Sequence, residues 1–100
     1  MKKVFICSPL RGDIKNNIKK AKEYSRMAVK KGYLPITPHI YFTQFLDDGI
    51  EAEREVALKM NIELLDLCDE LWIFGNKITE GMQREINYWG DKPKKVWKQR

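Results

Sequence analysis

The sequence predicts an α/β domain with a flavodoxin- or Rossmann-like three-layer α/β/α arrangement around a small parallel sheet of about four to five strands. Short apolar runs typical of buried strands alternate with longer segments of helical periodicity. The resulting order, β-α-β-α-β-α-β, favours a parallel sheet with helices on its faces. The 100 residues fit one domain, 1–100, and contain no internal repeat or low-complexity tract.

The first half of the chain contains two of these strands and the helix between them. Val4 to Cys7 is a compact apolar run, which is typical of a buried parallel strand. Asp13 is a good N-cap for the helix that follows, and Gly32 is a plausible residue to end it. Tyr33 to Thr37 is the second short strand. The apolar positions of the helix are Ile14, Ile18, Ala21, Tyr24, Ala28 and Val29.

The second half begins with an irregular aromatic stretch, His39 to Gly49, which we expect to pack as a loop or short helix over the sheet edge or a pocket. Glu51 to Leu67 is the second long helix, and Glu70 to Phe74 is the third strand. Thr79 can cap a third helix that runs to about residue 89. The predicted apolar stripe of the second helix is Ala52, Val56, Met60 and Leu64.

The net charge of +5 arises from 19 basic and 14 acidic residues. Much of the excess lies near the end of the chain, on Lys92, Lys94, Lys95, Lys98 and Arg100. This pattern is typical of a solvated face, and it also suits a phosphate-bearing partner. Together with Trp97 it resembles a nucleic-acid contact, but Lys95 to Trp97 equally predicts a short last strand.

Cysteine and histidine usage favours a reduced, cytoplasmic protein without a metal centre. Cys7 and Cys68 lie in apolar contexts and suggest no disulfide framework. His39 is the only histidine, so a structural zinc site is not expected, and we expect no cofactor. No apolar run approaches the roughly 20 residues that span a membrane, and we expect no signal peptide.

In such folds ligands bind outside the carboxyl ends of the strands, where three loops are predicted to meet. The first loop joins a strand to a helix N-terminus, whose free N–H groups bind anions. Arg11 can add a bidentate grip on phosphate or carboxylate. The alternative is a simple turn with the arginine in water. The candidate binding residues of this loop are Ser8, Pro9, Leu10, Arg11, Gly12 and Asp13.

The second loop follows the second strand and contains His39, Tyr41 and Phe42. His39 and Tyr41 are candidate base contacts, since an aromatic side chain offers a stacking face. The alternative is that the aromatic side chains belong to the core and that the histidine is packed and hydrogen-bonded.

The third loop and its helix contain the candidate binding residues Gly75, Gly81 and Met82. A glycine in the first helical turn lets a ligand approach the backbone closely. Glu85 lies one turn further along the same face and can act as a nucleophile on a sugar carbon. The alternative is a solvated or salt-bridged glutamate, paired with Arg84 or Lys77.

Residues 81–88, Gly-Met-Gln-Arg-Glu-Ile-Asn-Tyr, resemble the Gly-x-x-x-Glu-[Leu/Ile]-Gly-Tyr signature of nucleoside 2-deoxyribosyltransferases and 2′-deoxynucleoside 5′-phosphate N-hydrolases. In that signature the glutamate is the catalytic nucleophile that attacks the anomeric carbon and displaces the base. The resemblance places this role on Glu85, while Asn87 replaces the usual glycine.

The resemblance extends over most of the chain. Residues 5–12, Phe-Ile-Cys-Ser-Pro-Leu-Arg-Gly, resemble the first-strand loop of the N-hydrolases, which is associated with nucleotide phosphate. Residues 65–74 resemble the approach to the third strand. The strongest match is to a short phage and bacterial branch with Ser-Pro-x-x-Gly-Asp, Pro-His and Cys-Asp-Glu-Leu-Trp motifs, all of which this sequence contains.

Three departures concern proton transfer. By spacing, Asn61 stands where the transferases have an aspartate that assists proton transfer to the base. Thr79 stands where the family has a second aspartate. An asparagine cannot exchange that proton as a carboxylic acid does. The N-hydrolases also use a serine near the C-terminus, lent across a dimer, whereas no serine follows Ser25 here.

Three functions follow as hypotheses. The first is hydrolysis or transfer at the N-glycosidic bond of a nucleoside or nucleotide, with Glu85 as nucleophile. The second is a module that binds a nucleotide-derived ligand without cleaving it, as a sensor or sequestering protein. The third is a nucleic-acid accessory role, for which a steep salt dependence of affinity is the test. The resemblance also implies a homodimer or higher homo-oligomer, while the lack of a long apolar run predicts no membrane partner.

Overall fold

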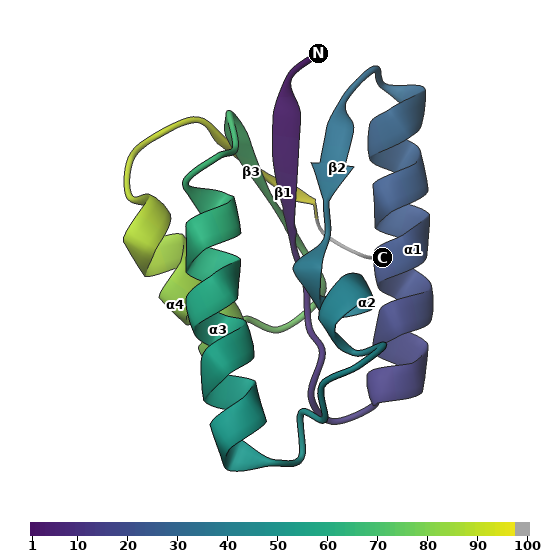
Figure 1. The fold of residues 1–100 in the computed structure, drawn as a ribbon. Helices are drawn as coiled ribbons and strands as arrows, with labels where there is room; N and C mark the ends of the chain where they lie inside the picture. The colour runs from purple at the N-terminus through teal and green to yellow at the C-terminus, as the bar shows by residue number, and fades with distance from the viewer. Residues whose placement is uncertain (98–100) are drawn as a thin grey trace.

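Four parallel strands form the central sheet of the computed structural model, which describes residues 1–97 (Figure 1). Their order across the sheet is β2-β1-β3-β4, so the chain crosses over between β2 and β3. β1 pairs with both β2 and β3, with Phe5 opposite Ile36 and Leu71. The strands are β1 (Lys3–Cys7), β2 (Leu34–Ile36), β3 (Glu70–Phe74) and β4 (Lys94–Trp97).

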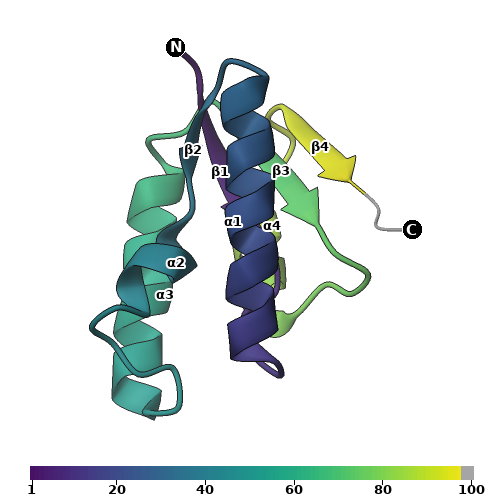
Figure 2. The ribbon, with the colours of Figure 1, turned by 90° about the vertical axis from the view of Figure 1, so that its right-hand side faces the viewer.

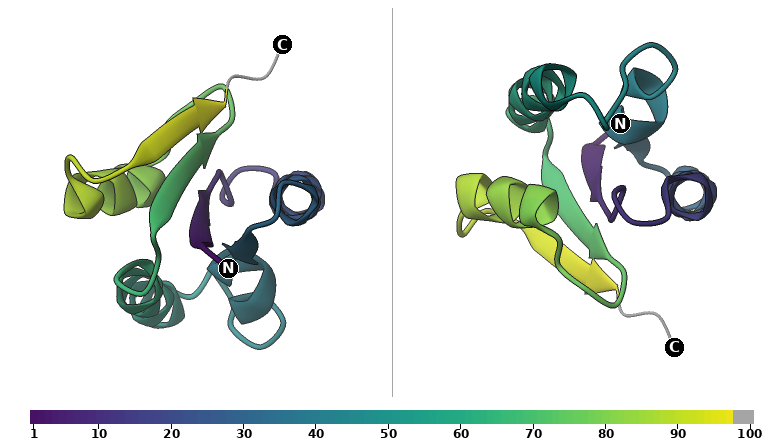
Figure 3. Two further views of the ribbon diagram at one scale, coloured as in Figure 1. Left: turned by 90° about the horizontal axis from the view of Figure 1, so that it is seen from above. Right: turned by 90° about the horizontal axis from the view of Figure 1, so that it is seen from below.

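Helices cover both faces of this sheet (Figures 2 and 3). α1 lies on one face, and α3 and α4 lie together on the other. The short α2 follows β2 and contacts both α1 and α3. This confirms the predicted three-layer α/β/α fold. The helices are α1 (Ile14–Lys30), α2 (Pro38–Phe42), α3 (Glu51–Leu65) and α4 (Glu80–Trp89).

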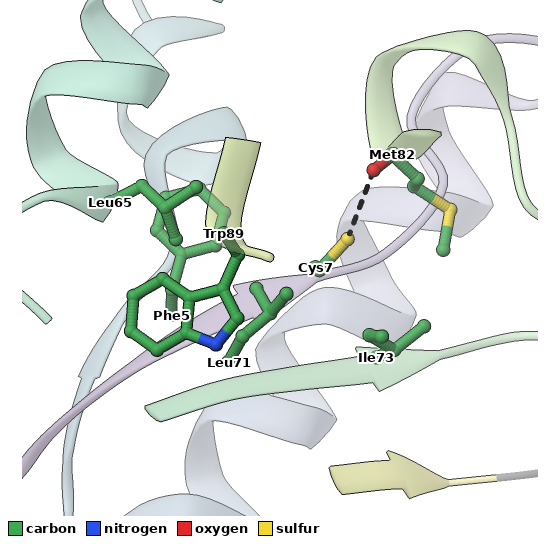
Figure 4. Close-up of a cluster of buried hydrophobic side chains, with 7 residues drawn as sticks. All are labelled: Phe5, Cys7, Leu65, Leu71, Ile73, Met82 and Trp89. Atoms are coloured by element: carbon green, nitrogen blue, oxygen red, sulfur yellow. Dashed lines mark hydrogen bonds between the residues drawn. The ribbon is translucent and has the colours of Figure 1, made fainter. Parts of the chain in front are cut away.

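Alternate strand residues build two separate apolar layers because successive side chains point to opposite faces. One layer packs under α3 and α4 (Figure 4) and contains Phe5, Cys7, Leu65, Leu71, Ile73, Met82 and Trp89. The other packs under α1 and contains Val4, Ile6, Ala28, Trp72 and Phe74. Since both faces are covered, β1 and β3 are apolar at every position after their first residues, Lys3 and Glu70, as is usual for a parallel sheet.

The predicted ends of the helices agree closely with the structure. The Asp13 side chain accepts a hydrogen bond from the backbone N–H of Asn16 and caps α1. Gly32 follows this helix with a φ of +86°, in the left-handed region that favours glycine. The Thr79 hydroxyl accepts a hydrogen bond from the N–H of Met82 and caps α4.

The predicted apolar stripe of α3 holds in its second half, where Met60 is half-buried and Leu64 packs against the core, and was wrong in its first half. Ala52 and Val56 are exposed, and α3 ends at Leu65 rather than at residue 67. The buried residues of this helix are instead Arg54, Asn61 and Leu65. Because two of these three are polar, the apolar periodicity missed the most buried face of the helix. The outer ends of the predicted α1 stripe, Ile14 and Val29, are likewise exposed.

The basic end of the chain lies partly against aromatic rings. Lys92 lies over Trp89, with 4.2 Å between Nζ and the ring centroid, and Lys95 lies 5.4 Å from the ring centre of Trp72. These contacts give the two lysines structural partners. The predicted basic residues Lys98 and Arg100 lie outside the described residues.

The longest helix of residues 1–97, α1, carries many charged side chains, and none of the described helices is long and apolar enough to cross a membrane.

Candidate functional site

The carboxyl ends of β1, β2 and β3 lie at one end of the sheet and open into a cavity of about 180 Å³ between the first loop, α3 and α4. We refer to it as the inner cavity. Its position is the one at which parallel α/β sheets bind ligands. It is lined by Ser8, Leu10, Arg11, His39, Asp48, Arg54, Leu58, Asn61, Thr79, Glu80, Gly81 and Met82.

Glu85 lies at the inner end of this site, in the second turn of α4. Its residue is only 7% exposed, and its Oε2 accepts a hydrogen bond of 3.2 Å from Nδ2 of Asn61. Asn61 lines the cavity, whereas Glu85 is not among the lining residues. The salt bridge with Arg84 that the sequence left open does not form, since Arg84 pairs with Glu55 and Glu80.

The surroundings of Glu85 change the acidity of its carboxyl. Burial raises the pKa of Glu85 to about 7, and hydrogen bonds from Cys7 and Asn61 oppose that rise. A carboxyl with this pKa is present in both charge states near neutral pH, which suits a group that reacts as a carboxylate and exchanges protons. Burial, with Glu85 nearby, raises the pKa of the Cys7 thiol, which therefore stays protonated.

Cys7 is the last residue of β1 and is completely buried. Its thiol donates to the carbonyl oxygen of Met82 at 3.9 Å (Figure 4). Through this contact and the one with Glu85, the end of β1 is joined to the first two turns of α4. The position of Glu85 is therefore fixed from two sides, by β1 and by α3.

His39 and Ser8 connect the first two strand ends. The Ser8 hydroxyl and Nε2 of His39 form a hydrogen bond of 3.0 Å, and both residues are buried. Burial lowers the pKa of His39 to about 4, so its ring is neutral at pH 7. His39 thus offers the cavity a neutral polar edge.

Arg11, Asp48 and Arg54 form a charged chain across the cavity. Nε of Arg11 donates to Oδ2 of Asp48 at 2.8 Å, and a second nitrogen donates to the Asp48 carbonyl at 3.0 Å. The guanidinium of Arg54 lies 4.0 Å from Oδ1 of Asp48. Arg11 is half exposed, but the Arg54 side chain is only 9% exposed.

Two further hollows adjoin the inner cavity. A recess of about 50 Å³ continues from it to the apolar side chains of Phe42 and Leu46, and we refer to it as the apolar recess. The recess and the inner cavity share Leu10, His39, Asp48, Arg54, Leu58 and Asn61. On the α1 side, a basic cavity of about 260 Å³ shares Ser8, Arg11 and Thr79 with the inner cavity. The other residues that line this basic cavity are Pro9, Asn17, Lys20, Tyr24, Gly75, Asn76 and Lys77.

The structure brings most of the sequence-predicted residues to these three hollows. Of the others, Gly12 forms a turn with a φ of +101°, and Asp13 is the cap of α1. Tyr41 is 64% exposed, meets the ring of Phe42 at a tilt and that of Phe45 edge-on, and lines none of the three hollows. The first loop therefore divides between ligand-facing and structural positions.

Gly75 connects the first and third loops. Its φ is +107°, and a Cβ at this position would lie 3.1 Å from Cδ of Pro9. A side chain here would be strained by both its backbone and its neighbour. The close approach of the two loops accounts for a glycine at the end of β3.

From the sequence, Arg54 and Asp48 were not identified as cavity residues. Asn61 was singled out only because the related transferases have an aspartate at that position. A signal was present, because Arg54, Leu58, Asn61 and Leu65 recur at the spacing of one helical face. Since polar residues occupy half of that face, a search for apolar periodicity overlooks it. Among residues 1–97, no group of three or more metal-binding side chains is placed to hold a metal ion.

The fold resembles that of a nucleoside-processing enzyme. A solved structure of a 2-deoxyribosyltransferase from the psychrotolerant bacterium Bacillus psychrosaccharolyticus, described as a biocatalyst for nucleoside synthesis, superposes with a TM-score of 0.73. It is 17% identical and covers 96% of this chain, which in turn covers 72% of the transferase chain. This likeness shows that the chain has the 2-deoxyribosyltransferase fold.

A comparison of the sequence with curated proteins finds no match. A family model does match, over residues 2–98, which is nearly the whole chain. The chain therefore belongs to the family described as Domain of unknown function (DUF7768).

Proposed function

We propose that this protein breaks the N-glycosidic bond of a nucleoside or nucleotide, by hydrolysis or by transfer, with Glu85 as the nucleophile. The observation that carries the proposal is the buried Glu85 carboxyl beside a strand-end cavity, with a pKa of about 7 and a hydrogen bond to the cavity residue Asn61. The fold shared with a 2-deoxyribosyltransferase supports the choice of bond.

The reaction proceeds in two displacements. The ionised Glu85 oxygen forms a bond to the anomeric carbon, and the base leaves with the electron pair of the glycosidic bond and takes a proton from water. Water or a second base then attacks the same carbon and releases the carboxylate. Covalent catalysis of this kind splits one difficult step into two easier ones. In this proposal water supplies the first proton, because Asn61 is not an acid and the His39 ring is neutral.

The three hollows suit the three parts of such a ligand. The sugar belongs in the inner cavity, beside Asn61, whose Oδ1 is buried without a partner. A sugar hydroxyl satisfies such an acceptor. The apolar recess suits a base, and the basic cavity, with Lys20 and Lys77, suits a phosphate.

The proposal is tested by incubating the purified protein with deoxynucleosides, deoxynucleotides and ribonucleotides and measuring free base by mass spectrometry. Wild type releases base from at least one of them, and Glu85→Gln, which keeps the shape and removes the negative charge, releases none. Glu63→Gln, an exposed position on α3, is the matched control and keeps full activity. Base release by Glu85→Gln at the wild-type rate excludes Glu85 as the nucleophile.

A second candidate function is binding of the same ligand without cleavage. Two observations favour binding without cleavage. Position 61 holds an asparagine, which cannot supply a proton as a carboxylic acid does, and Glu85 lies behind the residues that line the cavity. The same assay separates the two functions. A panel returned intact, with one member retained by the protein through gel filtration, identifies a binding module.

We also propose that copies of this chain associate. The sheet has two open edges, at β2 and β4, and the edge strands expose the apolar side chains of Leu34 and Val96. An open edge offers unpaired backbone groups with which a second chain can pair. Light scattering that returns the mass of a single 11.9 kDa chain at micromolar concentration contradicts this proposal.

A further inference from the structure

Among the charged side chains that line the inner cavity, that of Arg54 is the least exposed. It is 9% exposed and lies in the second turn of α3, where it lines both the inner cavity and the apolar recess. Its two ion pairs, with Asp48 and Glu55, both have a length of 4.0 Å. That length exceeds the usual range of a hydrogen bond.

The neighbouring carboxylates are already engaged by other arginines. The Asp48 carboxylate accepts one hydrogen bond from Arg11 through Oδ2, while the second Arg11 bond goes to the Asp48 backbone carbonyl. The Glu55 carboxylate accepts hydrogen bonds from Arg84. Within residues 1–97, Arg54 therefore makes no side-chain hydrogen bond of ordinary length to either carboxylate. A guanidinium presents five N–H donors in a fixed fork and has no acceptor. Arg54 thus directs unused donors toward the cavity.

The position of Arg54 relative to Glu85 shows which part of a ligand it meets. Arg54 and Asn61 are seven residues apart on α3, which is two turns and about 10.5 Å along the helix axis. Asn61 contacts Glu85 and thus marks the anomeric carbon. A base bonded to that carbon extends away from Glu85, toward Arg54, between the apolar side chains of Leu10 and Leu58.

The charge around Arg54 favours a neutral acceptor over a phosphate. Asp48 lies close enough to balance the charge of Arg54, although it does not hydrogen-bond to it. The lysines Lys20 and Lys77, which suit a phosphate, line the other cavity, on the α1 side. An arginine binds two neighbouring acceptors of one base well, and its commonest such partner is the O6 and N7 pair of a 6-oxopurine.

We propose that Arg54 selects the base of the ligand by donating two hydrogen bonds to the O6 and N7 atoms of a 6-oxopurine, a guanine or hypoxanthine base. This inference rests on the proposed function, because it places a nucleoside in the inner cavity. Adenine is disfavoured because its N6 amine is a donor and would face the guanidinium. A site that is built around such donors strongly rejects an analogue that leaves them unpaired.

The test measures binding rather than turnover, in the Glu85→Gln background, by titration calorimetry with 2′-deoxyinosine and 2′-deoxyadenosine. These nucleosides share the sugar and differ at the 6-position of the purine. We expect deoxyinosine to bind roughly tenfold more tightly or better. Adding Arg54→Met brings the two affinities to near equality, and Arg54→Lys, which keeps one donor group but loses the fork, gives an intermediate ratio.

Arg84→Met is the matched control, since Arg84 is an exposed arginine that contacts the same Glu55, and it keeps the full preference. A circular dichroism spectrum and melting temperature establish that each variant is folded. Equal binding of both nucleosides by the parent, binding of neither, a preference for deoxyadenosine, or a preference that survives in folded Arg54→Met overturns the inference.

The two proposals fail in different ways. If the parent shows the base preference but wild type releases no base from either nucleoside, the catalytic proposal fails and the role of Arg54 stands. If wild type releases both bases with equal kcat/KM and the affinities are equal, the role of Arg54 fails and the catalytic proposal stands.

Discussion

The side-chain amide of Asn61 donates a hydrogen bond of 3.2 Å to the buried carboxyl of Glu85 and so joins α3 to α4 at the inner end of the cavity. The donor fixes the orientation of the amide, so its Oδ1 is left as a buried acceptor without a partner among residues 1–97. One side chain therefore both stabilises the Glu85 carboxylate and presents an unfilled acceptor beside it.

The pH dependence of turnover tests this relationship. Because the nucleophile is the ionised carboxyl, kcat/KM is expected to rise with pH and to level off above the Glu85 pKa of about 7. Asn61→Leu removes a hydrogen bond that lowers this pKa, so the rising limb moves to higher pH. Asn87→Leu, at an exposed position of α4, leaves the profile unchanged. A profile that Asn61→Leu does not move contradicts the assignment.

The stability of the fold should depend on pH through the same group. The pKa of Glu85 is about 7 in the folded protein and about 4.5 as a free side chain. Between these values the folded state holds the proton more tightly, so stability falls as pH rises and is constant above pH 7. Glu85→Gln cannot ionise, so it does not lose this unfolding free energy, which is on the order of 3 kcal/mol at most above pH 7.

Urea unfolding of both proteins from pH 5 to pH 8 measures this effect. The advantage of Glu85→Gln in unfolding free energy is expected to grow from pH 5 to about pH 7 and to stay constant above it. His39, whose pKa is lowered to about 4, acts with the opposite sign but equally in both proteins, so it cancels in the difference. A variant that is less stable than wild type by the same amount at every pH is inconsistent with a buried, ionising Glu85.

Gly81 offers a test in which stability and activity move in opposite directions. A Cβ at this helical position would lie 3.6 Å from Cδ2 of Leu58, an ordinary contact, and its backbone needs no positive φ. Gly81→Ala is therefore expected to stabilise the protein by up to about 1 kcal/mol. Because Gly81 lines the inner cavity, the added methyl group also lowers kcat/KM. Full activity in a stabilised variant shows that no ligand approaches this turn.

The cap of α4 is expected to support the site through the helix. The Thr79 hydroxyl accepts the N–H of Met82, so Thr79→Ala costs about 1 kcal/mol of stability. Thr79→Ser keeps the accepting hydroxyl and restores most of the loss. Denaturant midpoints of the three proteins provide the measurement, and equal losses in alanine and serine variants exclude the cap as the cause.

The fold was predictable because its signals are local. Continuous apolar runs at β1 and β3, the caps Asp13 and Thr79, and a glycine after α1 each specify an element from a few adjacent residues. Helix α3 is the exception. Its inward face serves the cavity as well as the core, so it carries Arg54 and Asn61, and hydrophobic periodicity does not find these polar residues.

The site was predictable only in part, for the same reason. The helical spacing of Gly81 and Glu85 placed both near the strand ends, as the structure shows. The partners of Glu85 come from β1 and α3, with Cys7 and Asn61 each more than 20 positions away along the chain. Such contacts depend on how the layers pack. Tyr41 illustrates the converse, since an aromatic residue near a strand end lies exposed on a short helix.

The most direct test of the account is to look for the covalent intermediate. Wild type is mixed with a deoxynucleoside that it cleaves, quenched in acid within one turnover, digested, and analysed by mass spectrometry. The account predicts a deoxyribosyl adduct on the peptide that contains Glu85 and none in Glu85→Gln. Base release without any adduct, together with an active Glu85→Gln, contradicts it.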